Sequence, residues 1–413
     1  MSIDKDAQKA PNLRFKGFTD DWEQRRLGEL SNIVGGGTPS TSNPEYWDGD
    51  IDWYAPAEIG EQSYVNKSKK TITELGLKKS SARILPVGTV LFTSRAGIGN
   101  TTILAKEATT NQGFQSIVPD QNKRDSYFIF SRTNELKRYG EVTGAGSTFV
   151  EVSGKQMSKM PIMVPVLSEQ QEIGTFLEQI DNTITLHQRK LDQLKQLKEA
   201  LLQQMFPGKG ETVPKLRFAG FEGDWEARKL GEIAPLRGGY AFESDKFTDV
   251  GIPIIRISNI LSSGNVGGSF AYYKEGENDS KYTLEDKSIL IAMSGATTGK
   301  ISILHNENKD KYYQNQRVGY FQKTTKTDYD FIATLLKTTA FPQKLTSLLV
   351  SGAQPNVSAS DIDNLNFRIP ASITEQFKIG DYISKLDKII NKQNSKIESL
   401  QSMKQVLLEN MFI

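Results

Sequence analysis

The sequence contains no cysteine and only two histidines, His187 and His305. The lack of cysteine excludes disulfides and thiolate chemistry, and it is typical of a cytosolic protein of bacterial type. With so few histidines, a histidine-based catalytic triad or zinc site is not expected. No apolar run reaches the roughly 18 residues of a membrane span, so no membrane-spanning segment is expected. The polar N-terminus also lacks the apolar core of a signal peptide.

A strong net charge is missing too, because 51 Lys and Arg stand against 49 Asp and Glu, for a formal net charge of +2. Nucleic-acid-binding proteins often show a strongly basic balance, and this chain does not. Charge is less even locally, since residues 31–60 contain five acids and no Lys or Arg, whereas residues 61–138 have an excess of Lys and Arg. At 413 residues the chain has room for two or three domains, each with its own core.

The signatures of common catalytic and nucleotide-binding sites are missing as well. Residues 295–300 resemble a phosphate-binding loop, but only three residues separate the two glycines, and Ile301 stands where a Ser or Thr would bind magnesium. We interpret this segment as a turn. Asn43-Pro44 is followed by Glu45, which departs from the Asn-Pro-Pro-aromatic motif of amino-methyltransferases. We therefore expect no catalytic residue, no bound cofactor and no metal site, and we expect that the chain is not an enzyme.

What the chain does contain is an internal repeat in two places. Residues 11–30 and 214–233 are identical at 13 of 20 positions, at an offset of 203. Residues 168–206 return as 374–412 at an offset of 206, whereas the long stretches between these echoes barely resemble each other. A period of about 200 residues is too long for a solenoid repeat. It indicates a duplicated unit of domain plus helix, and two such units tend to pack with approximate two-fold symmetry.

The repeat of residues 168–206 at 374–412 predicts two long helices. Ser168, with Gln171 three residues later, forms a capping-box pattern, and the apolar residues that follow recur with the 3.5-residue period of a coiled coil. Polar residues interrupt both copies at matching positions, His187 and Lys198 in the first and Gln393 and Lys404 in the second, as is typical of residues that fix register. Helices of about 55 Å, running antiparallel, would hold two domains a fixed distance apart. The residues expected to form the helix seam and to bind partners are Leu177, Ile184, Leu191, Leu194, Ile383, Ile390, Ile397 and Leu400.

These patterns predict an α+β chain. Two globular domains of mixed β-sheet with helices would be related by a pseudo-two-fold axis and joined by two long antiparallel coiled-coil helices. The expected divisions are a flexible N-terminus at 1–10, a first domain at 11–167, its helix at 168–206, a linker at 207–213, a second domain at 214–373 and its helix at 374–413.

Each inner stretch places glycines beside short polar side chains in the same order. Glycine runs at 35–37 and 238–239 open the two stretches, and Asn-Gln pairs at 111–112 and 315–316 lie in later turns. Glycines let backbone N–H groups approach phosphates, while Asn and Gln can bind adenine and Arg can bind guanine. The candidate DNA-binding residues are Thr38, Ser40, Ser94, Arg95, Asn111, Gln112, Ser147, Thr148, Tyr240, Arg256, Ser258, Ser294, Lys300, Asn315, Gln316, Arg317 and Gln354.

In these features the chain resembles the specificity (S) subunits of type I restriction–modification systems. The resemblance rests on the paired LRF-x-GF-x-x-x-W-E-x-R-x-LGE segments, the GGGTPS and GGYAF openings, the Asn-Gln turns and the Glu-Gln helix starts, and it covers nearly the whole chain from about residue 11. It implies two target-recognition domains, 11–167 and 214–373, each reading one half of a split, asymmetric sequence in double-stranded DNA. It also implies two modification subunits, which bind S-adenosylmethionine and methylate adenine, and two restriction subunits that use ATP and magnesium. A cytoplasmic protein without a membrane partner is expected.

Two alternatives stay open at this point. The chain could be a coiled-coil scaffold whose globular parts bind no DNA. It could also be an enzyme, a nuclease or a methyltransferase, with a site that no known motif marks. Turnover of DNA by the isolated chain with magnesium and S-adenosylmethionine would support the enzyme.

Overall fold

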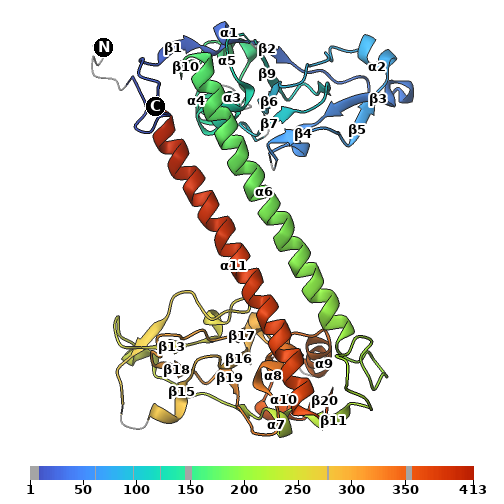
Figure 1. Ribbon diagram of the computed structural model, residues 1–413, viewed down its shortest axis with the longest axis vertical. Coiled ribbons are helices and arrows are strands. Elements are labelled where there is room, and N and C mark those ends of the chain that lie inside the picture. The colour runs from blue at the N-terminus through green and yellow to red at the C-terminus, as the bar shows by residue number, and fades with distance from the viewer. Residues whose placement is uncertain are drawn as a thin grey trace. The chain divides into compact units, whose positions relative to one another are not determined.

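A computed structural model describes residues 9–60, 62–95, 97–120, 122–144, 151–276, 279–349 and 356–413. The chain divides into two compact units. Unit 1 comprises Met1–Arg189 and Ser395–Ile413, and unit 2 comprises Lys190–Asn394. Segments from both ends of the chain therefore build unit 1 (Figure 1).

Two long helices confirm the prediction drawn from the repeat of residues 168–206 at 374–412. Helix α6 spans Leu167–Gln204 and helix α11 spans Ile373–Met411, and each begins in one unit and ends in the other (Figure 1). The predicted N-cap at Ser168 is wrong. Helix α6 begins one residue earlier, and the backbone N–H groups of Glu169 and Gln170 both donate to the Val166 carbonyl at 3.1 Å. No helix among the described residues combines the length and the apolar character needed to cross a membrane.

The inner stretches, which differ in sequence, fold with a similar strand order. The strands of unit 1 are β2 (Ser31–Gly35), β3 (Trp47–Tyr54), β4 (Tyr64–Val65), β5 (Lys70–Ile72), β6 (Val90–Phe92), β7 (Thr101–Leu104), β8 (Thr109–Thr110) and β9 (Gln115–Pro119). Those of unit 2 are β12 (Leu236–Arg237), β13 (Ile252–Ile255), β14 (Ala271–Tyr273), β15 (Thr283–Leu284), β16 (Ile289–Ala292), β17 (Ile301–Ile303), β18 (Tyr312–Gln314) and β19 (Val318–Phe321).

Each unit contains two larger sheets built from these strands. In unit 1 they have the orders β2-β9-β6-β7-β4 and β5-β3-β8, and in unit 2 the orders β12-β19-β16-β17 and β14-β13-β18-β15. The central pairings β3–β8 and β13–β18 are both parallel, whereas β3–β5 and β13–β14 are antiparallel. The prediction of mixed sheets with helices is therefore confirmed. The two units share the order of the central strands in spite of their different sequences, while β4 is added to one sheet of unit 1 and β15 to one sheet of unit 2.

Short elements of the repeated frame close each unit. Strand β1 (Glu23–Arg26) pairs with β10 (Pro161–Val164) in unit 1, and β11 (Glu226–Lys229) pairs with β20 (Asn366–Ile369) in unit 2, both antiparallel. The short α-helices are α1 (Leu27–Leu30), α2 (Glu74–Lys78), α3 (Ser126–Ser131), α4 (Thr133–Gly144) and α5 (Gly154–Ser158) in unit 1, and α7 (Leu230–Ile233), α8 (Tyr329–Leu335), α9 (Ala340–Leu349) and α10 (Ala359–Asp363) in unit 2. The 3-10 helices are η1 (Pro44–Tyr46), η2 (Pro56–Glu58), η3 (Ser244–Lys246), η4 (Ile257–Asn259), η5 (Asp279–Tyr282) and η6 (Gly295–Thr297).

Inside each unit, the N-terminal repeat (residues 11–30 or 214–233) contacts the end of a long-helix repeat (residues 374–412 or 168–206). In unit 1 the ring of Phe412, just after helix α11, lies 6.2 Å from Trp22 and 5.4 Å from Phe128. In unit 2 the ring of Phe206, just after helix α6, lies 5.7 Å from Trp225 and stacks on the ring of Phe331 at 5.6 Å. The repeated segments are therefore the parts that dock a helix end onto a globular domain, which explains why both copies carry them.

A buried ion pair joins the N-terminal repeat of each unit to the start of the long helix that begins in that unit. In unit 1 the Arg14 guanidinium donates to both carboxylate oxygens of Glu169, at 2.6 and 2.8 Å, and Glu169 is fully buried in the first turn of helix α6. In unit 2 Arg217 holds Glu375 in the same bidentate way, at 2.7 and 2.9 Å. The pairing raises the pKa of Arg14 through its hydrogen bond to the carboxylate. The Glu-Gln helix start thus acts as an anchor for the repeated N-terminal segment.

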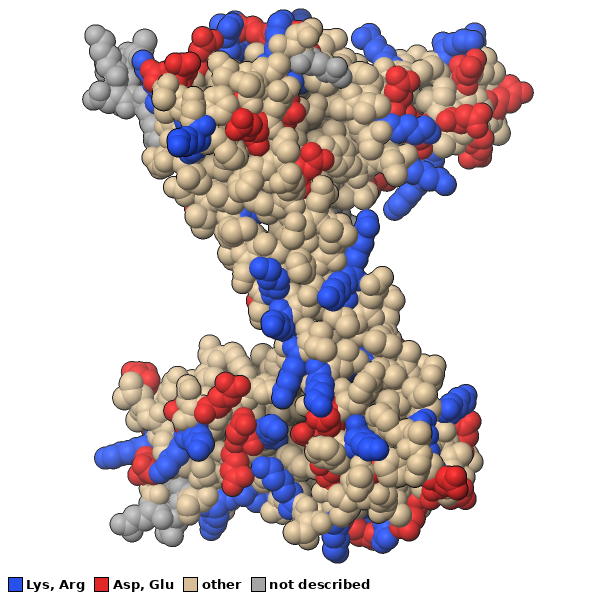
Figure 2. Space-filling view, viewed as in Figure 1, with Lys and Arg blue, Asp and Glu red and all other residues tan. Residues whose placement is uncertain are grey.

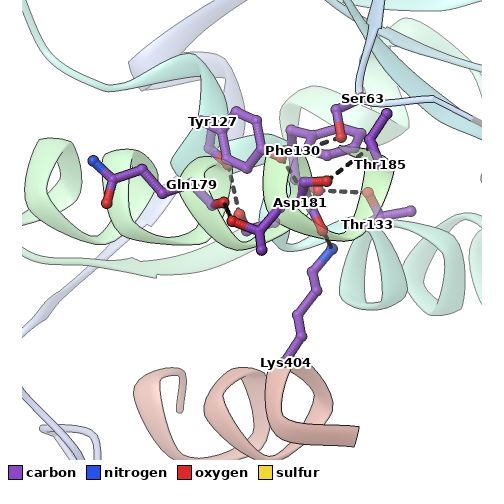
Figure 3. A network of polar contacts seen from close by, with 10 residues as sticks. Ser63, Tyr127, Phe130, Thr133, Gln179, Asp181, Thr185 and Lys404 are labelled. Atoms are coloured by element: carbon purple, nitrogen blue, oxygen red, sulfur yellow. Dashed lines mark hydrogen bonds and ion pairs between the residues drawn. The ribbon is translucent and has the colours of Figure 1, made fainter. Parts of the chain in front are cut away.

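Matched ion pairs set the register of the helix pair, as the polar interruptions predicted. In unit 1 the Lys404 ammonium on α11 lies 2.6 Å from Asp181 on α6 (Figure 3), and in unit 2 Lys198 on α6 lies 2.5 Å from Asp387 on α11. These four residues are two pairs at an offset of 206, so each lysine of one copy meets the aspartate of the other. The contacts place the end of one helix beside the start of the other, which is an antiparallel arrangement.

The aspartate of unit 2 carries an additional lysine. Lys337 lies 2.8 Å from Asp387. Burial raises the pKa of the Asp387 carboxyl, but the charge of Lys337 and the hydrogen bond from Lys198 outweigh burial and hold that pKa below its ordinary value. The carboxyl is therefore ionised at neutral pH, and both lysines stay attracted to it.

The predicted seam residues point into the interior. Leu177 is fully buried in the core of unit 1, together with Trp22, Phe128 and Met411. The remaining seam residues are buried or half-buried: Ile184, Leu191, Leu194, Ile383, Ile390, Ile397 and Leu400. The seam prediction agrees with this burial. The chain itself covers the buried ones, and the expectation that these side chains bind a further subunit stays a prediction.

Candidate functional site

Three loops that were singled out in the first inner stretch meet in unit 1. The backbone N–H of Gly37 donates to the Thr110 carbonyl at 2.8 Å, and the Thr38 hydroxyl donates to the Gln112 side-chain oxygen. A Cβ atom at Gly36 would lie 2.0 Å from the Asn111 carbonyl oxygen, so only glycine permits this approach of the two loops. The glycine run therefore serves to bring Thr38 and Gln112 together at the surface.

Arg95 extends this cluster from the hairpin between β6 and β7. Its guanidinium donates to the Gln112 carbonyl at 3.0 Å and lies 3.1 Å from the Glu151 carboxylate. About two fifths of the Arg95 side chain is exposed (42%), so the group is held in place and still reaches solvent. Sequence reasoning missed Glu151, because the two residues are 56 positions apart and no local motif marks the acid.

The corresponding loops of unit 2 meet in the same way. The Tyr240 N–H donates to the Gln314 carbonyl at 3.0 Å, and the Gln316 N–H donates to the Tyr240 carbonyl at 2.8 Å. A Cβ atom at Gly239 would lie 2.2 Å from the Asn315 carbonyl oxygen, which repeats the close approach at Gly36. The Arg317 carbonyl accepts from the Met293 N–H at 3.0 Å, which brings the loop after β16 to the same place.

A buried side chain supports the loops of unit 2 from below. Gln314 is fully buried, and its side-chain oxygen accepts from the Arg237 guanidinium at 2.9 and 3.1 Å while its amide donates to the Val318 carbonyl at 2.7 Å. Burial lowers the pKa of Arg237, whose guanidinium lies 4.8 Å from the Tyr320 ring. This support fixes the backbone from which Asn315 and Gln316 project.

The exposed chemistry of unit 2 differs from that of unit 1. The side chains of Gln316 and Arg317 are exposed and form no hydrogen bond or ion pair with any residue that the structure describes. Tyr240 is 41% exposed and its ring lies 5.0 Å from that of Tyr282, an aromatic partner that the sequence patterns did not single out. Unit 1 presents a hydroxyl, an amide and a paired guanidinium, whereas unit 2 presents aromatic rings, a free amide and a free guanidinium.

Residues of the η4 and η6 segments lie next to these loops. The Asn315 N–H donates to the Ile255 carbonyl at 3.1 Å, directly before Arg256, and Ser258 is exposed one turn later. The segment 295–300 forms a turn, as predicted, with η6 at its start. Its last residue, Lys300, donates to the Ser262 hydroxyl at 2.9 Å, which places the lysine at the margin of the cluster.

Several predicted residues do not offer their side chains to a ligand. Ser94 is fully buried and Ser294 is almost as deeply buried, at 9% exposure, so neither side chain is exposed, and their DNA-binding role stays a prediction. The Asn111 side chain is occupied, because its oxygen accepts from the Gly113 N–H at 2.7 Å. Ser40 is exposed and lies in the loop before η1, where its carbonyl accepts from the indole N–H of Trp47 at 3.1 Å. Ser147, Thr148 and Gln354 lie outside the described residues.

Charge on unit 1 is divided between two regions. Acidic side chains gather over the outer end of the β5-β3-β8 sheet and helix α2 (Figure 2), and they include the exposed Glu45, Asp48 and Asp50. A phosphate backbone is repelled by such a surface, so the loop cluster around Arg95 is the better candidate for a DNA contact. Among the residues described, no group of three His, Cys, Asp or Glu side chains is placed to hold a metal ion.

A family model for the type I restriction modification DNA specificity domain matches the chain twice, at residues 19–196 and 222–399. The chain belongs to this family. The resemblance drawn from the sequence is thereby confirmed, and the chain is the DNA sequence specificity subunit of a type I restriction–modification complex, a class of subunit that is non-catalytic.

Relatives and solved structures agree with this membership. The chain is 28% identical over 414 residues to the type I restriction enzyme MjaIX specificity subunit of Methanocaldococcus jannaschii, covering 94% of this chain and 92% of that protein. It is 30% identical over 184 residues to the EcoR124I/EcoR124II specificity subunit of Escherichia coli, covering 42% of this chain and 44% of that protein. Its fold is similar to that of the S subunit of the type I restriction–modification system from M. genitalium, with a TM-score of 0.66 at 15% identity, covering 98% of this chain and 99% of that one.

Proposed function

We propose that this specificity subunit reads a bipartite, asymmetric sequence in double-stranded DNA, one half with the loops of unit 1 and the other half with the loops of unit 2. The observation that carries the proposal is one loop arrangement with two sets of side chains. The Asn-Gln pairs at 111–112 and 315–316 are common to both units, but beside them unit 1 presents Thr38 and the Glu151-paired Arg95, whereas unit 2 presents Tyr240, Tyr282 and the exposed Arg317. Base edges in the major groove differ in their donors and acceptors, so different side chains select different bases. The two half-sites are therefore expected to differ in sequence.

Catalysis belongs to partner subunits in this proposal. Two modification subunits bind S-adenosylmethionine and methylate adenine in the recognised sequence, and two restriction subunits use ATP and magnesium for translocation and cleavage. The adenine must leave the base stack to be methylated, at a cost of about a few kcal/mol that falls on the modification subunits. The chain described here supplies the choice of sequence, and the complex works in the cytoplasm.

Changing Arg95 or Gln316 to Ala is expected to relax base choice in one half-site each. Loss of a side chain that contacts a base edge costs roughly 1–3 kcal/mol for the cognate base and little for the others. The measurement is competition binding by the complex with its modification subunits, using duplexes that carry each single-base change of the mapped recognition sequence. A loss of affinity that is the same for all duplexes would assign the residue to phosphate contact and contradict the prediction.

Matched variants separate this effect from a loss of charge or of packing. Arg138→Ala removes an exposed arginine from α4, and Gln343→Ala an exposed glutamine from α9, both outside the loops. Each is expected to leave base choice unchanged. Glu151→Gln removes the acid beside Arg95 but keeps the guanidinium, and it is expected to retain the wild-type preference.

Lengthening both helices is expected to lengthen the unread spacer between the half-sites. One heptad would be inserted after Leu191 in α6 and one after Asn394 in α11, seven residues from Lys198 and from Asp387, so that the facing register is kept. A heptad adds about 10.5 Å of helix, or about three base pairs. Methylome sequencing should show a spacer longer by about three base pairs or a loss of methylation, whereas a heptad placed in the linker 207–213 should change nothing. Methylation at the original spacer would contradict the role of the helices.

A further inference from the structure

Unit 1 contains a cleft of about 680 Å³ that the proposed reading loops do not use. Its walls come from the loop before β4, the return of the β6–β7 hairpin, the end of helix α3, helix α4, helix α6 and the last turns of helix α11. All of these segments belong to unit 1. Figure 3 shows the side of the cleft where Asp181, Tyr127 and Lys404 meet.

The acid in this cleft is already neutralised by the protein. Asp181 is the single Asp or Glu among the described residues that line the cleft. Its carboxylate accepts from the Tyr127 hydroxyl at 2.6 Å and from the Lys404 ammonium at 2.7 Å. Burial raises the pKa of Tyr127, and the carboxylate raises it further, so the hydroxyl stays a donor. Lys404 and Asp181 therefore cancel, and neither is available to a ligand.

Two other cations of the cleft have no such partner. Lys137 on α4 and Arg189 on α6 are both exposed, and neither forms an ion pair or hydrogen bond with any residue that the structure describes. The other described residues of the lining are glycines, apolar residues and neutral polar ones such as Asn100, Asn134 and Gln401. Counted over the described residues, the cleft is thus a polar hollow in which the charges of Lys137 and Arg189 have no acidic partner, which suits an anion with several acceptor oxygens.

The cleft begins where the reading hairpin ends. The Gly99 N–H donates to the Thr93 carbonyl at 3.0 Å, so Arg95 stands at the turn of the hairpin while Asn100 enters the cleft. A Cβ atom at Gly99 would lie 2.3 Å from Lys137, so the lysine packs directly on the returning strand. Lys137 therefore packs against the same hairpin that carries Arg95 at its turn.

Unit 2 uses the corresponding positions differently. Position 337, at an offset of 203 from Asn134, is a lysine that pairs with Asp387. Gly299, which closes the equivalent hairpin, faces the apolar Leu345 where Gly99 faces Lys137. Lys337 thus pairs with Asp387 within unit 2, and Leu345 takes the place beside Gly299 that Lys137 has beside Gly99.

We propose that the cleft of unit 1 binds backbone phosphates next to the half-site that unit 1 reads, with Lys137 and Arg189 as the contacting cations. The inference rests on the proposed function. Phosphate contacts fix the register and orientation of a protein on the duplex without reading sequence. The cleft would therefore set how the first half-site is presented to Arg95, and it would contribute affinity without contributing base choice.

The test uses the full chain assembled with its modification subunits and a duplex carrying the methylation-mapped sequence. Lys137→Gln with Arg189→Gln is compared with Arg138→Gln with Lys190→Gln, which removes the same charge from exposed neighbours that do not line the cleft. Because each phosphate contact contributes about 0.9 to the slope of log K against log salt, the cleft variant is expected to lose about 1.8 of that slope. The recognition sequence should stay unchanged, and the control should lose clearly less.

A second arm locates the phosphates. Neutral methylphosphonates placed singly along both strands should weaken wild-type binding at one or two positions beside the first half-site, and the cleft variant should be insensitive at those positions only. Specific binding with equal slopes for both variants, and no position where the methylphosphonate effect depends on the cleft, would overturn the inference while leaving the proposed function standing. An unchanged slope with weaker assembly of the modification subunits in the absence of DNA would assign the cleft to an acidic protein segment and also overturn it. A lack of preference for the mapped duplex would contradict the proposed function itself.

Discussion

Replacing Arg14 by Met is expected to destabilise unit 1 by about 3 kcal/mol, because it leaves the carboxylate of Glu169 buried without its counter-ion. Glu169 is fully buried and receives both of its short contacts from Arg14. An unpaired buried charge costs far more than the pair contributes, so removal of the arginine alone is the severe change. Hydrogen exchange is the suitable measurement, since it reports each unit separately. Slowly exchanging amides of unit 1 should lose protection by about a hundred-fold, while those of unit 2 keep theirs.

Three control variants test this account. Arg25→Met breaks the ion pair with Glu23, in which both side chains are at least half exposed, and should cost less than about 1 kcal/mol. Arg14→Met combined with Glu169→Leu removes both charges and should recover most of the loss. Arg217→Met should transfer the same loss of protection to unit 2. Equal protection of unit 1 in the wild type and in Arg14→Met would show that the pair does not anchor helix α6.

The helices were predictable because their signal is local and repeated. The 3.5-residue period and the matched lysines at 198 and 404 determine a seam and its register without knowledge of the rest of the chain. The aspartates that these lysines meet were not predicted, because their partners lie on the other helix. The role of the repeat at 11–30 and 214–233 in docking a helix end could not be predicted for the same reason. Trp22 meets Phe412 from the opposite end of the chain, and no sequence pattern expresses such a contact.

The candidate site was predicted in outline and not in detail. Recurrence of the glycine runs and Asn-Gln pairs identified the loops that do converge, since close backbone approach needs glycine at Gly36 and Gly239. The direction of a side chain at the end of a strand was not predictable, and Ser94 turned out to be buried. The likeness of the two domains was predicted from the repeated frame, whereas their strand order was not, because it is fixed by backbone pairing while the side chains diverged.

Exchange of residues 31–160 for the matching stretch of a relative is expected to change one half of the recognition sequence completely and to leave the other half as it is. The cut points fall directly after α1 and directly before β10, so the β1–β10 sheet, the Arg14–Glu169 pair and the Asp181–Lys404 pair stay in place. All described loops around Arg95 move with the exchanged stretch, and none of the loops around Gln316 does. Exchange of the matching stretch of unit 2 should alter the opposite half.

Methylome sequencing of cells that express each exchanged chain with its modification subunits tests this account most directly. We predict a new half-site next to an unchanged one, with an unchanged spacer, and with the altered half changing sides when unit 2 is exchanged. Alteration of both halves by either single exchange, in a complex that still methylates DNA, would contradict the idea that each unit reads its own half.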